Sequence, residues 1–363
     1  MDMNEELQRF KDPALARQLV GTIQKLAPES ATLMEVCGTH THEIFKLGIR
    51  NLLPENIELI SGPGCPVCVT PCGFIDMACE LALGKGCTVC TFGDLIRVPG
   101  TEMSLADART KGAEIKIVYT ALDALDFARN NPDKEVVFLS VGFETTTPAA
   151  CLTVKKAKEE GITNYSILTA NKTMPNAYNA LKGSADAFLY PGHVNAITGE
   201  EDCERLAYEE GISGVIAGFT AKELLTAIAV IIRRLEKGEP FFVNCYPRVV
   251  TREGSKPAKK LIDETMELTD STWRGLGVIP KSGLKLREEY KDYDASYKYD
   301  VPYTDGKPNP GCRCGDVLQG KCKPCDCPLF GKVCTPLHPV GACMVSNEGS
   351  CSAFYQYGGI ING

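Results

Sequence analysis

The feature that most constrains how this chain can fold is an alternation of short β-rich runs with amphipathic helical patterns. Strands separated by such helices form parallel sheets of βαβ units. The expected strands are Thr32–Val36, Ile57–Ile60, Thr88–Phe92, Ile115–Tyr119, Val136–Val141, Tyr165–Thr169, Ala187–Tyr190 and Gly214–Ala217. The helical patterns lie around Phe74–Leu83, Leu105–Lys111, Leu122–Arg129, Ala149–Glu160, Asn176–Leu181, Glu201–Glu210 and Ala221–Lys237. Eight strands are many for one small sheet, so the pattern predicts two α/β halves divided near residues 145–160.

The composition and hydrophobic pattern of the sequence change after about residue 255. Lys256–Leu268 predicts one more helix, and beyond Trp273 the chain is rich in Tyr, Pro, Gly and Cys. This composition is typical of a small irregular module that is stapled by metal. We therefore expect an α/β domain over residues 1–150, a second over 151–254 around a central cleft, and a cysteine-rich domain over 255–363.

Charge and hydropathy exclude several classes of protein. The net charge is −7, whereas a nucleic-acid binder needs a basic stripe. The acidic start, Met1 to Glu6, lacks the apolar run of a secretory signal. The longest apolar run, Leu224–Ile232, is far shorter than the roughly 20 residues of a membrane span. We expect a cytoplasmic protein that binds neither nucleic acid nor membrane.

The 18 cysteines are unevenly distributed, with seven in residues 1–90, three in 91–311 and eight in 312–363. In a reducing compartment, such clusters favour metal or redox chemistry over structural disulfides. The isolated Cys151, Cys203 and Cys245 are interpreted as small buried hydrophobic residues. Cys90 is expected in the core, on the opposite side of its strand from Cys87.

Several expected strands end in unusual polar or cysteine-bearing turns. In parallel α/β sheets the site lies outside the carboxyl ends of the strands, so these turns are expected to converge on one cleft. The turns are Cys37-Gly-Thr-His40, Gly62-Pro-Gly-Cys-Pro-Val-Cys68, Gly93-Asp94, Gly142-Phe-Glu-Thr-Thr-Thr-Pro148 and Pro191-Gly-His-Val194.

Cys65 and Cys68 have a spacing that lets two thiolates reach one metal or each other. A helix beginning near Pro71–Phe74 would favour their thiolate form through its dipole. Cys37 on the neighbouring turn is a possible third sulfur, and soft thiolates suit iron, copper(I) or zinc. A structural zinc knuckle and a plain dithiol remain alternatives.

Polar side chains in the same turns are candidates for proton chemistry. His40 follows Cys37 closely enough to act as its hydrogen-bond partner, while His42 is interpreted as a solvent neighbour of a helix start. Glu144 and His193 each lie in a glycine-containing turn after a strand. Taken alone, Glu144 is better explained by complementing the dipole of a helix at its N-terminus.

The eight cysteines of the tail form a second cluster of candidate metal ligands. A four-thiolate iron–sulfur cluster or a structural zinc would each use four of them, and spacing alone does not select the four. They are Cys312, Cys314, Cys322, Cys325, Cys327, Cys334, Cys343 and Cys351.

Together these motifs resemble the HypD family of [NiFe]-hydrogenase maturation proteins, in order and over essentially the whole chain. The resemblance is carried by Cys37-Gly-Thr-His40, Gly62-Pro-Gly-Cys-Pro-Val-Cys68, Gly142-Phe-Glu-Thr-Thr146 and Pro191-Gly-His-Val194. In the tail it is carried by Cys327-Pro-Leu-Phe-Gly-Lys-Val-Cys334-Thr-Pro, Pro339-Val-Gly-Ala-Cys-Met-Val-Ser346 and Glu348-Gly-Ser-Cys351.

The resemblance implies a scaffold on which the Fe(CN)₂CO unit of the hydrogenase active site is built. It implies a complex with HypC and delivery of cyanide by HypE, supplied through HypF. It further implies iron held by Cys37, Cys65 and Cys68, with Glu144 and His193 lining the cleft. A [4Fe–4S] cluster would be held by Cys327, Cys334, Cys343 and Cys351. The extra tail cysteines leave that ligand set open.

Three functions follow as hypotheses. The first is an assembly scaffold in which Cys65 and Cys68 alternate between holding iron and forming a redox dithiol. The second is a cluster-dependent thiol–disulfide oxidoreductase acting on a protein disulfide. The third is a non-catalytic adaptor with structural zinc.

Overall fold

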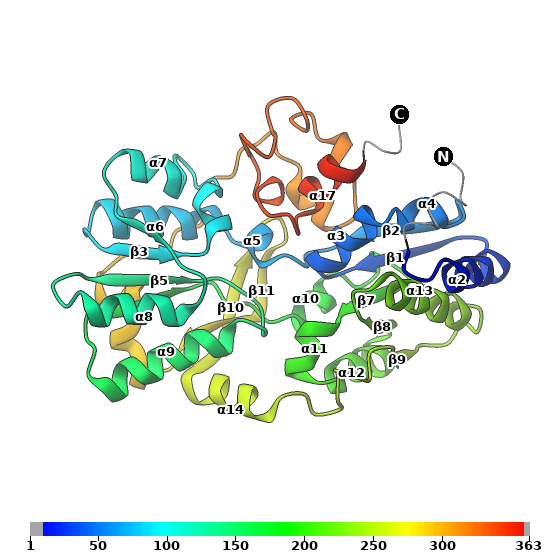
Figure 1. The fold of residues 1–363 in the computed structure, drawn as a ribbon, viewed down its shortest axis with the longest axis horizontal. Coiled ribbons are helices and arrows are strands. Elements are labelled where there is room, and N and C mark those ends of the chain that lie inside the picture. Colours follow the sequence, from blue (N-terminus) through cyan, green and yellow to red (C-terminus); the bar gives the residue numbers. More distant parts are fainter. Residues whose placement is uncertain (1–9, 359–363) are drawn as a thin grey trace.

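Two parallel β-sheets form the framework of the molecule (Figure 1). The computed structural model describes residues 10–358, so the acidic start of the chain lies outside the described residues. The first sheet, in the order β2-β1-β7-β8-β9, consists of β1 (Ala31–Glu35), β2 (Ile57–Ser61), β7 (Ala187–Pro191), β8 (Gly214–Ala217) and β9 (Phe242–Asn244). The second, in the order β4-β3-β5-β6, consists of β3 (Thr88–Thr91), β4 (Ile115–Ile117), β5 (Val136–Ser140) and β6 (Tyr165–Thr169). The predicted α/β class and all eight expected strands are confirmed; β9 was not expected.

Alternate side chains of the first sheet enter two different cores, as the two-residue period of a strand requires. Leu33 and Leu189 face one core, whereas Met34 and Phe188 face the other. The first core is covered by α2 (Pro13–Leu26), α3 (Gly38–Lys46), α4 (Ile49–Leu52) and α13 (Ala221–Leu235). Into the second core pack α10 (Pro175–Ala180), α11 (Gly192–Thr198) and α12 (Glu201–Glu210).

The second sheet is also covered on both faces, which explains its nearly continuous apolar strands. Val137 faces a core with α6 (Cys72–Leu83) and α7 (Leu105–Thr110), and Phe138 faces one with α8 (Ala121–Asn130) and α9 (Thr147–Glu160). Cys87 and Cys90 are buried in these two opposite cores. The expectation that they face opposite sides is therefore confirmed.

Helix starts follow capping signals that are visible in the sequence. The Asp12 carboxylate accepts a hydrogen bond from Leu15 N at 3.0 Å, and Pro13 takes the first helical position of α2. Reciprocal capping boxes begin α7, α8 and α13, at Ser104 and Asp107, Thr120 and Asp123, and Thr220 and Glu223.

Neither sheet corresponds to a contiguous stretch of chain. After β1 and β2 the chain passes through α5 (Pro66–Val69) and α6 into the second sheet, and it returns after α10 to add β7, β8 and β9 to the first. The expected ranges 1–150 and 151–254 therefore do not match the two sheets. Residue 150 lies inside α9, which connects the paired strands β5 and β6.

The region after residue 255 divides between the α/β framework and a separate tail. Helix α14 (Lys256–Thr265) packs on α9 and ends three residues earlier than expected, where the unexpected hairpin β10 (Met266–Trp273) and β11 (Gly277–Leu286) begins. The hairpin and η2 (Glu288–Tyr293) pack with the second sheet and α9, and α15 (Ala295–Lys298) packs on β6. The cysteine-rich module is therefore shorter than the expected 255–363.

The tail beyond residue 306 is largely irregular, as its composition predicts. Its helical segments are α16 (Cys314–Leu318), η3 (Pro324–Asp326), η4 (Ala342–Met344) and α17 (Ser350–Tyr357). It lies above both sheets in Figure 1, with α17 next to α3. Within residues 10–358, none of the helices combines the length and apolarity needed to cross a bilayer.

Candidate functional site

The turns after β1 and β2 meet at the carboxyl edge of the first sheet. These strands are neighbours in register, with Glu35 opposite Ser61, so they end level with each other. Gly38 N donates to Gly64 O at 2.9 Å, and Gly62 N donates to Glu35 O at 2.8 Å. The turn that holds Cys37 is thus hydrogen-bonded to the turn that precedes Cys65.

Gly64 allows this close approach because it has no side chain. A Cβ at residue 64 would overlap the backbone of Cys37. Cys37 itself is the N-cap of α3, and Cys65 is the N-cap of the single-turn helix α5. The expected convergence of these two cysteine turns is therefore a matter of backbone packing as well as of strand order.

Burial controls the protonation of Cys37. It raises the pKa of the Cys37 thiol to about 12, although the backbone N–H groups of His40 and Thr39 at the start of α3 lower it. The free thiol is therefore protonated at neutral pH, and binding a metal there would release a proton.

Cys68 faces the tail. Its Sγ lies 4.0 Å from Ala342 O, and its thiol interacts with those of Cys343 and Cys65. Contact with Cys343 lowers the pKa of Cys68, but contact with Cys65 and burial outweigh it, and the pKa lies well above its usual range. The expectation that a following helix dipole favours a Cys68 thiolate is therefore wrong for the free protein, because Cys68 is buried within α5.

Two of the predicted histidines contact the same aromatic ring, that of Phe219. The His193 ring stacks on Phe219 with centroids 4.0 Å apart, and the His40 ring lies 4.9 Å from the same ring. His40 is fully buried and burial lowers its pKa to about 4, although the nearby backbone of Ala217 and Gly218 acts to raise it. Neither ring nitrogen has a partner of good hydrogen-bond geometry among the described residues. Partial desolvation also lowers the pKa of His193, although its side chain is exposed at the surface. Both rings are therefore neutral near pH 7.

Glu144 combines a structural contact with an unsatisfied oxygen. Its Oε1 accepts a hydrogen bond from Met174 N at 2.9 Å, at the start of α10. Its Oε2 is buried without a partner in the described part of the chain. Burial raises the pKa of Glu144 to about 7. The carboxylate therefore binds the start of α10 and not that of α9, the helix that follows it in the chain. Its second oxygen remains for a ligand or a water.

Glu348 was not singled out from the sequence, although it lies in one of the tail motifs. Thr39 Oγ1 donates to Glu348 Oε1 at 2.6 Å, and Gly38 leaves room for the Glu348 Cβ. The Glu348 carboxylate also acts on the pKa of both Cys37 and His193. Only tertiary contact across 309 residues places it there.

Thiols of the tail gather around Gly341. A Cβ on Gly341 would lie 2.5 Å from Cys314 Sγ and 2.6 Å from Cys312 Sγ. Cys343 interacts with Cys314 and Cys351, and Val340 N donates to Cys334 Sγ at 3.4 Å. Cys334, Cys343 and Cys351 of the expected four are thus grouped with Cys312 and Cys314.

Cys327 approaches this group from one side. Its Sγ lies 3.8 Å from the carbonyl oxygen of Gly311, the residue before Cys312. Among residues 10–358, no three Cys, His, Asp or Glu side chains are arranged around one point as ligands of a single ion. Cys37, Cys65 and Cys68 therefore lie in adjoining turns without yet surrounding a common centre.

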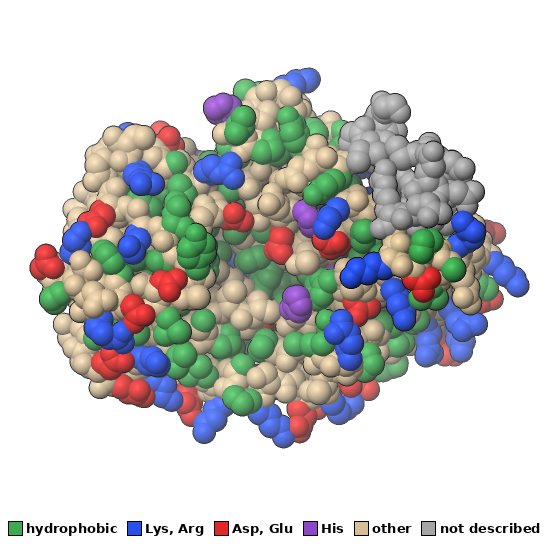
Figure 2. Space-filling model, in the orientation of Figure 1, with side chains coloured by type: hydrophobic (Ala, Val, Ile, Leu, Met, Phe, Trp, Pro, Cys, Tyr) green, Lys and Arg blue, Asp and Glu red, His purple; other side chains and the backbone are tan. Residues whose placement is uncertain are grey.

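The surface of the molecule is hollowed near its middle. Figure 2 shows a depression near the middle of the molecule, lined by apolar side chains and with acidic and histidine side chains at its edge. This depression lies between the halves built on the two sheets. It corresponds to the central cleft expected from the strand order.

Comparison with known proteins gives consistent matches over almost the whole chain. The HypD family model, described as "Hydrogenase formation hypA family", matches residues 14–358. The protein named hydrogenase maturation factor HypD from Cupriavidus necator is 41% identical over 366 residues, covering 97% of each chain. The protein of that name from Rhodobacter capsulatus is 42% identical, over 96% of this chain and 97% of the relative. That from Escherichia coli K12 is 41% identical, over 94% and 93%.

Proposed function

The chain belongs to the HypD family of hydrogenase maturation factors, and from this premise we propose that it is the scaffold and redox centre for assembly of the Fe(CN)₂CO unit. One observation carries the proposal. The Cys65–Cys68 turn is hydrogen-bonded through its glycines to the Cys37 turn, and Cys68 contacts the tail thiols on its other side. The Cys65–Cys68 dithiol would thus connect the proposed iron site at Cys37 with the proposed redox site in the tail.

The iron unit is the cargo, and Cys37, Cys65 and Cys68 are its proposed ligands. Thiolates are soft ligands that suit iron, and three ligands leave positions open for cyanide and CO. Since the Cys37 thiol is protonated when free, binding would release a proton, and loss of the iron would take one up. Because a proton can replace iron on the Cys37 sulfur, the iron unit can be released to another protein.

Two buried groups are proposed to donate hydrogen bonds to the cargo. Burial lowers the pKa of His40 to about 4, so its ring is neutral at pH 7, and raises the pKa of Glu144 to about 7, which favours its protonated form. A protonated carboxyl or an imidazole N–H can donate a hydrogen bond to the nitrogen end of a bound cyanide. The unpartnered Glu144 Oε2 and His40 ring nitrogens support this role.

The tail has the donor set of an iron–sulfur cofactor. Several buried thiols in mutual contact, none of them in a disulfide, suit a group that binds one thiolate per iron. We propose that Cys327, Cys334, Cys343 and Cys351 hold a [4Fe–4S] cluster, with Cys312 and Cys314 close enough to be alternative ligands. When bound, such a cluster supplies low-potential electrons.

Cys65 and Cys68 are proposed to change between a dithiol and a disulfide. Reduction of the disulfide adds two electrons and two protons and yields two thiols. Contact of Cys68 with both Cys65 and Cys343 favours exchange at this position. A thiol–disulfide oxidoreductase that acts on a protein disulfide would need the same contact. The experiment below therefore also distinguishes this second function.

Partners are proposed from the family alone. HypC is expected to share the iron, and HypE to deliver cyanide that reaches it through HypF. We propose that a partner approaches at the depression shown in Figure 2. We propose that this assembly takes place in the cytoplasm.

The test is infrared spectroscopy of the complex with HypC, purified without oxygen. Bands of iron-bound cyanide and CO are expected for the wild type and are lost in Cys37→Ala. Cys151→Ala is the matched control, because Cys151 is equally buried but isolated in the core of the second sheet, and it should retain the bands.

Three results would argue against the proposal. Bands of equal strength in Cys37→Ala would exclude Cys37 as a ligand. Reduction of protein disulfides without any such bands would favour the oxidoreductase. Zinc in the tail, without iron or sulfide, would exclude the cluster.

A further inference from the structure

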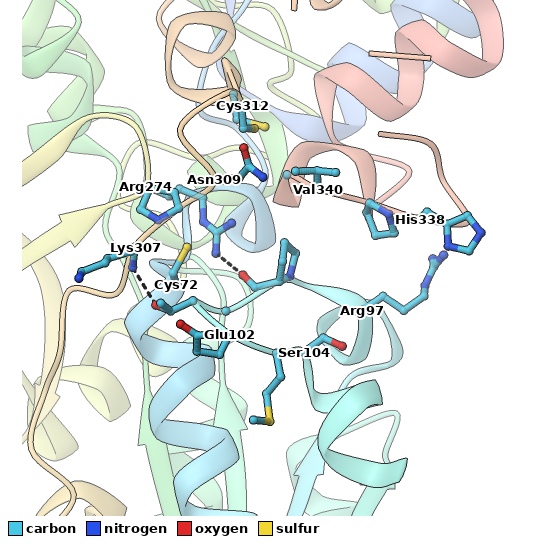
Figure 3. A pocket seen from close by; sticks show the side chains of 18 of the residues that line it. Cys72, Arg97, Glu102, Ser104, Arg274, Lys307, Asn309, Cys312, His338 and Val340 are labelled. Carbon is cyan, nitrogen blue, oxygen red and sulfur yellow. Dashed lines mark hydrogen bonds between the residues drawn. The ribbon is translucent and has the colours of Figure 1, made fainter. Parts of the chain in front are cut away.

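A cavity of about 940 Å³ lies between the tail and the half built on the second sheet. Its walls come from residues 97–107, Arg274 and two tail segments, 307–315 and 333–341. Cys72, Cys312 and Cys314 line it, and Figure 3 shows Cys72 and Cys312 within it. Its lining includes no residue of the Cys37 turn or of α17. The cavity therefore approaches the tail thiols from a different side than the cargo site does.

Two large apolar side chains stand exposed on the loop beside this cavity. Val333 is 60% exposed and Leu337 is 80% exposed, and both line the cavity. They flank Cys334, which is buried and belongs to the thiol group around Gly341. Exposed apolar side chains concentrated in so short a loop are typical of a protein-binding surface.

Basic side chains lie on the loop and on the walls of the cavity. Arg97 donates to Pro336 O of the loop at 2.5 Å, and the exposed Lys332 precedes Val333 in the chain. The exposed Lys307 lines the cavity on the side opposite Arg97 and His338 (Figure 3). The buried Arg274 binds Thr70 O at 2.7 Å and Pro99 O at 3.0 Å and has no acidic partner among the described residues.

Two acidic side chains, Glu102 and Asp107, also line the cavity, but the Asp107 carboxylate is bound within the capping box of α7. Hydrogen bonding leaves that carboxylate charged, so the lining has three basic side chains, Arg97, Arg274 and Lys307, against these two acidic ones, an excess of one positive charge. The protein as a whole carries a net charge of −7. An acidic partner would thus be repelled by the protein in general and attracted to this face.

We propose that this carrier face, formed by Arg97, Lys307, Lys332, Val333 and Leu337, docks an acidic one-electron carrier protein of the ferredoxin type. The inference rests on the proposed function, because the electron acceptor is the tail cluster. In the transfer the reduced carrier loses one electron and the oxidised cluster gains it. No bond is formed or broken, and no proton is moved.

The chemistry of the face favours a protein over a small reductant. Val333, Leu337 and Lys332 project from a loop at the margin of the cavity and offer contacts that a small anion inside it would not use. Weak redox complexes have small interfaces in which a few apolar contacts are ringed by charges. Complementary charge in such complexes mainly sets the rate of association.

The experiment uses the full chain with its iron and sulfide content verified. Reduction by a photoreduced plant-type [2Fe–2S] ferredoxin is followed by stopped-flow absorbance, with dithionite as the small-molecule reductant. Binding is measured separately with the gallium-substituted ferredoxin, which is redox-inert. The variants are Lys307→Glu, Lys332→Glu and Leu337→Ser. The control is Lys237→Glu, an exposed lysine just after α13 on the first sheet.

Each lysine reversal is expected to slow reduction by ferredoxin about tenfold at low salt, and the difference should shrink as salt screens the charges. Leu337→Ser should weaken binding of the gallium protein at every salt concentration. Dithionite should reduce all variants alike, and Lys237→Glu should behave as the wild type.

Two outcomes would overturn the docking face. One is a lack of ferredoxin binding by the cluster-loaded wild type. The other is equal loss in Lys307→Glu, Lys332→Glu and Lys237→Glu, which would show only general charge repulsion. A wild-type chain without iron and sulfide would instead contradict the proposed cofactor, and gallium-ferredoxin binding would still test the face.

Discussion

At the scale of single residues, burial decides the chemistry of the site. Desolvation raises the pKa of Cys37 and Glu144 and lowers that of His40. All three groups therefore shift toward their neutral forms. Because the free Cys37 thiol is protonated, binding of an iron cargo there would be coupled to release of its proton.

Glu144→Gln tests, through stability, whether burial raises the pKa of this carboxyl. The wild-type carboxyl ionises near 4.5 in the unfolded chain and near 7 in the folded protein, so the folded state loses stability as pH rises from about 4.5 to 7. Glutamine does not ionise, yet its carbonyl can still accept from Met174 N.

Relative to wild type, the variant should gain up to about 3 kcal/mol between pH 5 and pH 8. Urea unfolding at the two pH values measures the gain. A difference that does not change with pH would show that Glu144 is not protonated by burial.

At the scale of elements, the site depends on two level strand ends. Because β1 and β2 are parallel neighbours in register, the turns that follow them are brought together. The two turns approach each other so closely that residue 64 has no room for a side chain. Cys37 and Cys65 are the N-caps of α3 and α5, so both cysteines are held at helix starts.

Gly64→Ala should separate the two turns. Its Cβ would meet the Cys37 backbone, and overpacking of this kind costs about 1–3 kcal/mol. We expect lower thermal stability and weaker retention of iron-bound cyanide and CO.

The matched control is Gly21→Ala, inside α2, where a Cβ would meet nothing within 4 Å. It should stabilise the protein by about 0.5–1 kcal/mol. If Gly64→Ala were also stabilising, close packing of the turns would play no part.

At the scale of the whole molecule, the tail ties the two halves together. Thr39 and Glu348 join it to α3, and Arg97 donates to Pro336 O from the other half. Cys68 contacts Cys343 beneath it. Since the tail has little regular structure of its own, metal binding there would contribute to its folding.

Anaerobic removal of iron by a chelator should therefore loosen the tail while the sheets persist. We expect faster proteolytic cleavage within residues 307–358 and an almost unchanged far-ultraviolet circular dichroism spectrum. Mass spectrometry of the fragments locates the cuts. Cleavage that starts within the sheets, or no change at all, would contradict a folding role for the metal.

Strand periodicity and the turn motifs were enough to predict the α/β class, eight strands and the Cys37, Cys65 and Cys68 turns, since these depend on local pattern. The hairpin β10–β11 escaped prediction because its strands contain glycine, proline and charged residues that give little apolar alternation. The split of the halves at residue 150 failed for a different reason: sheet membership is decided by pairing between distant strands.

By itself, the sequence determined which residue types are available at each strand end and that the tail is rich in thiols, because these are properties of the chain read in order. Only the tertiary structure decided that β7 pairs with β1, that Glu348 meets Thr39, and that Cys68 faces Cys343 rather than Cys37. Such contacts join residues hundreds of positions apart, and they form because buried surfaces and hydrogen-bonding groups must all find partners at once.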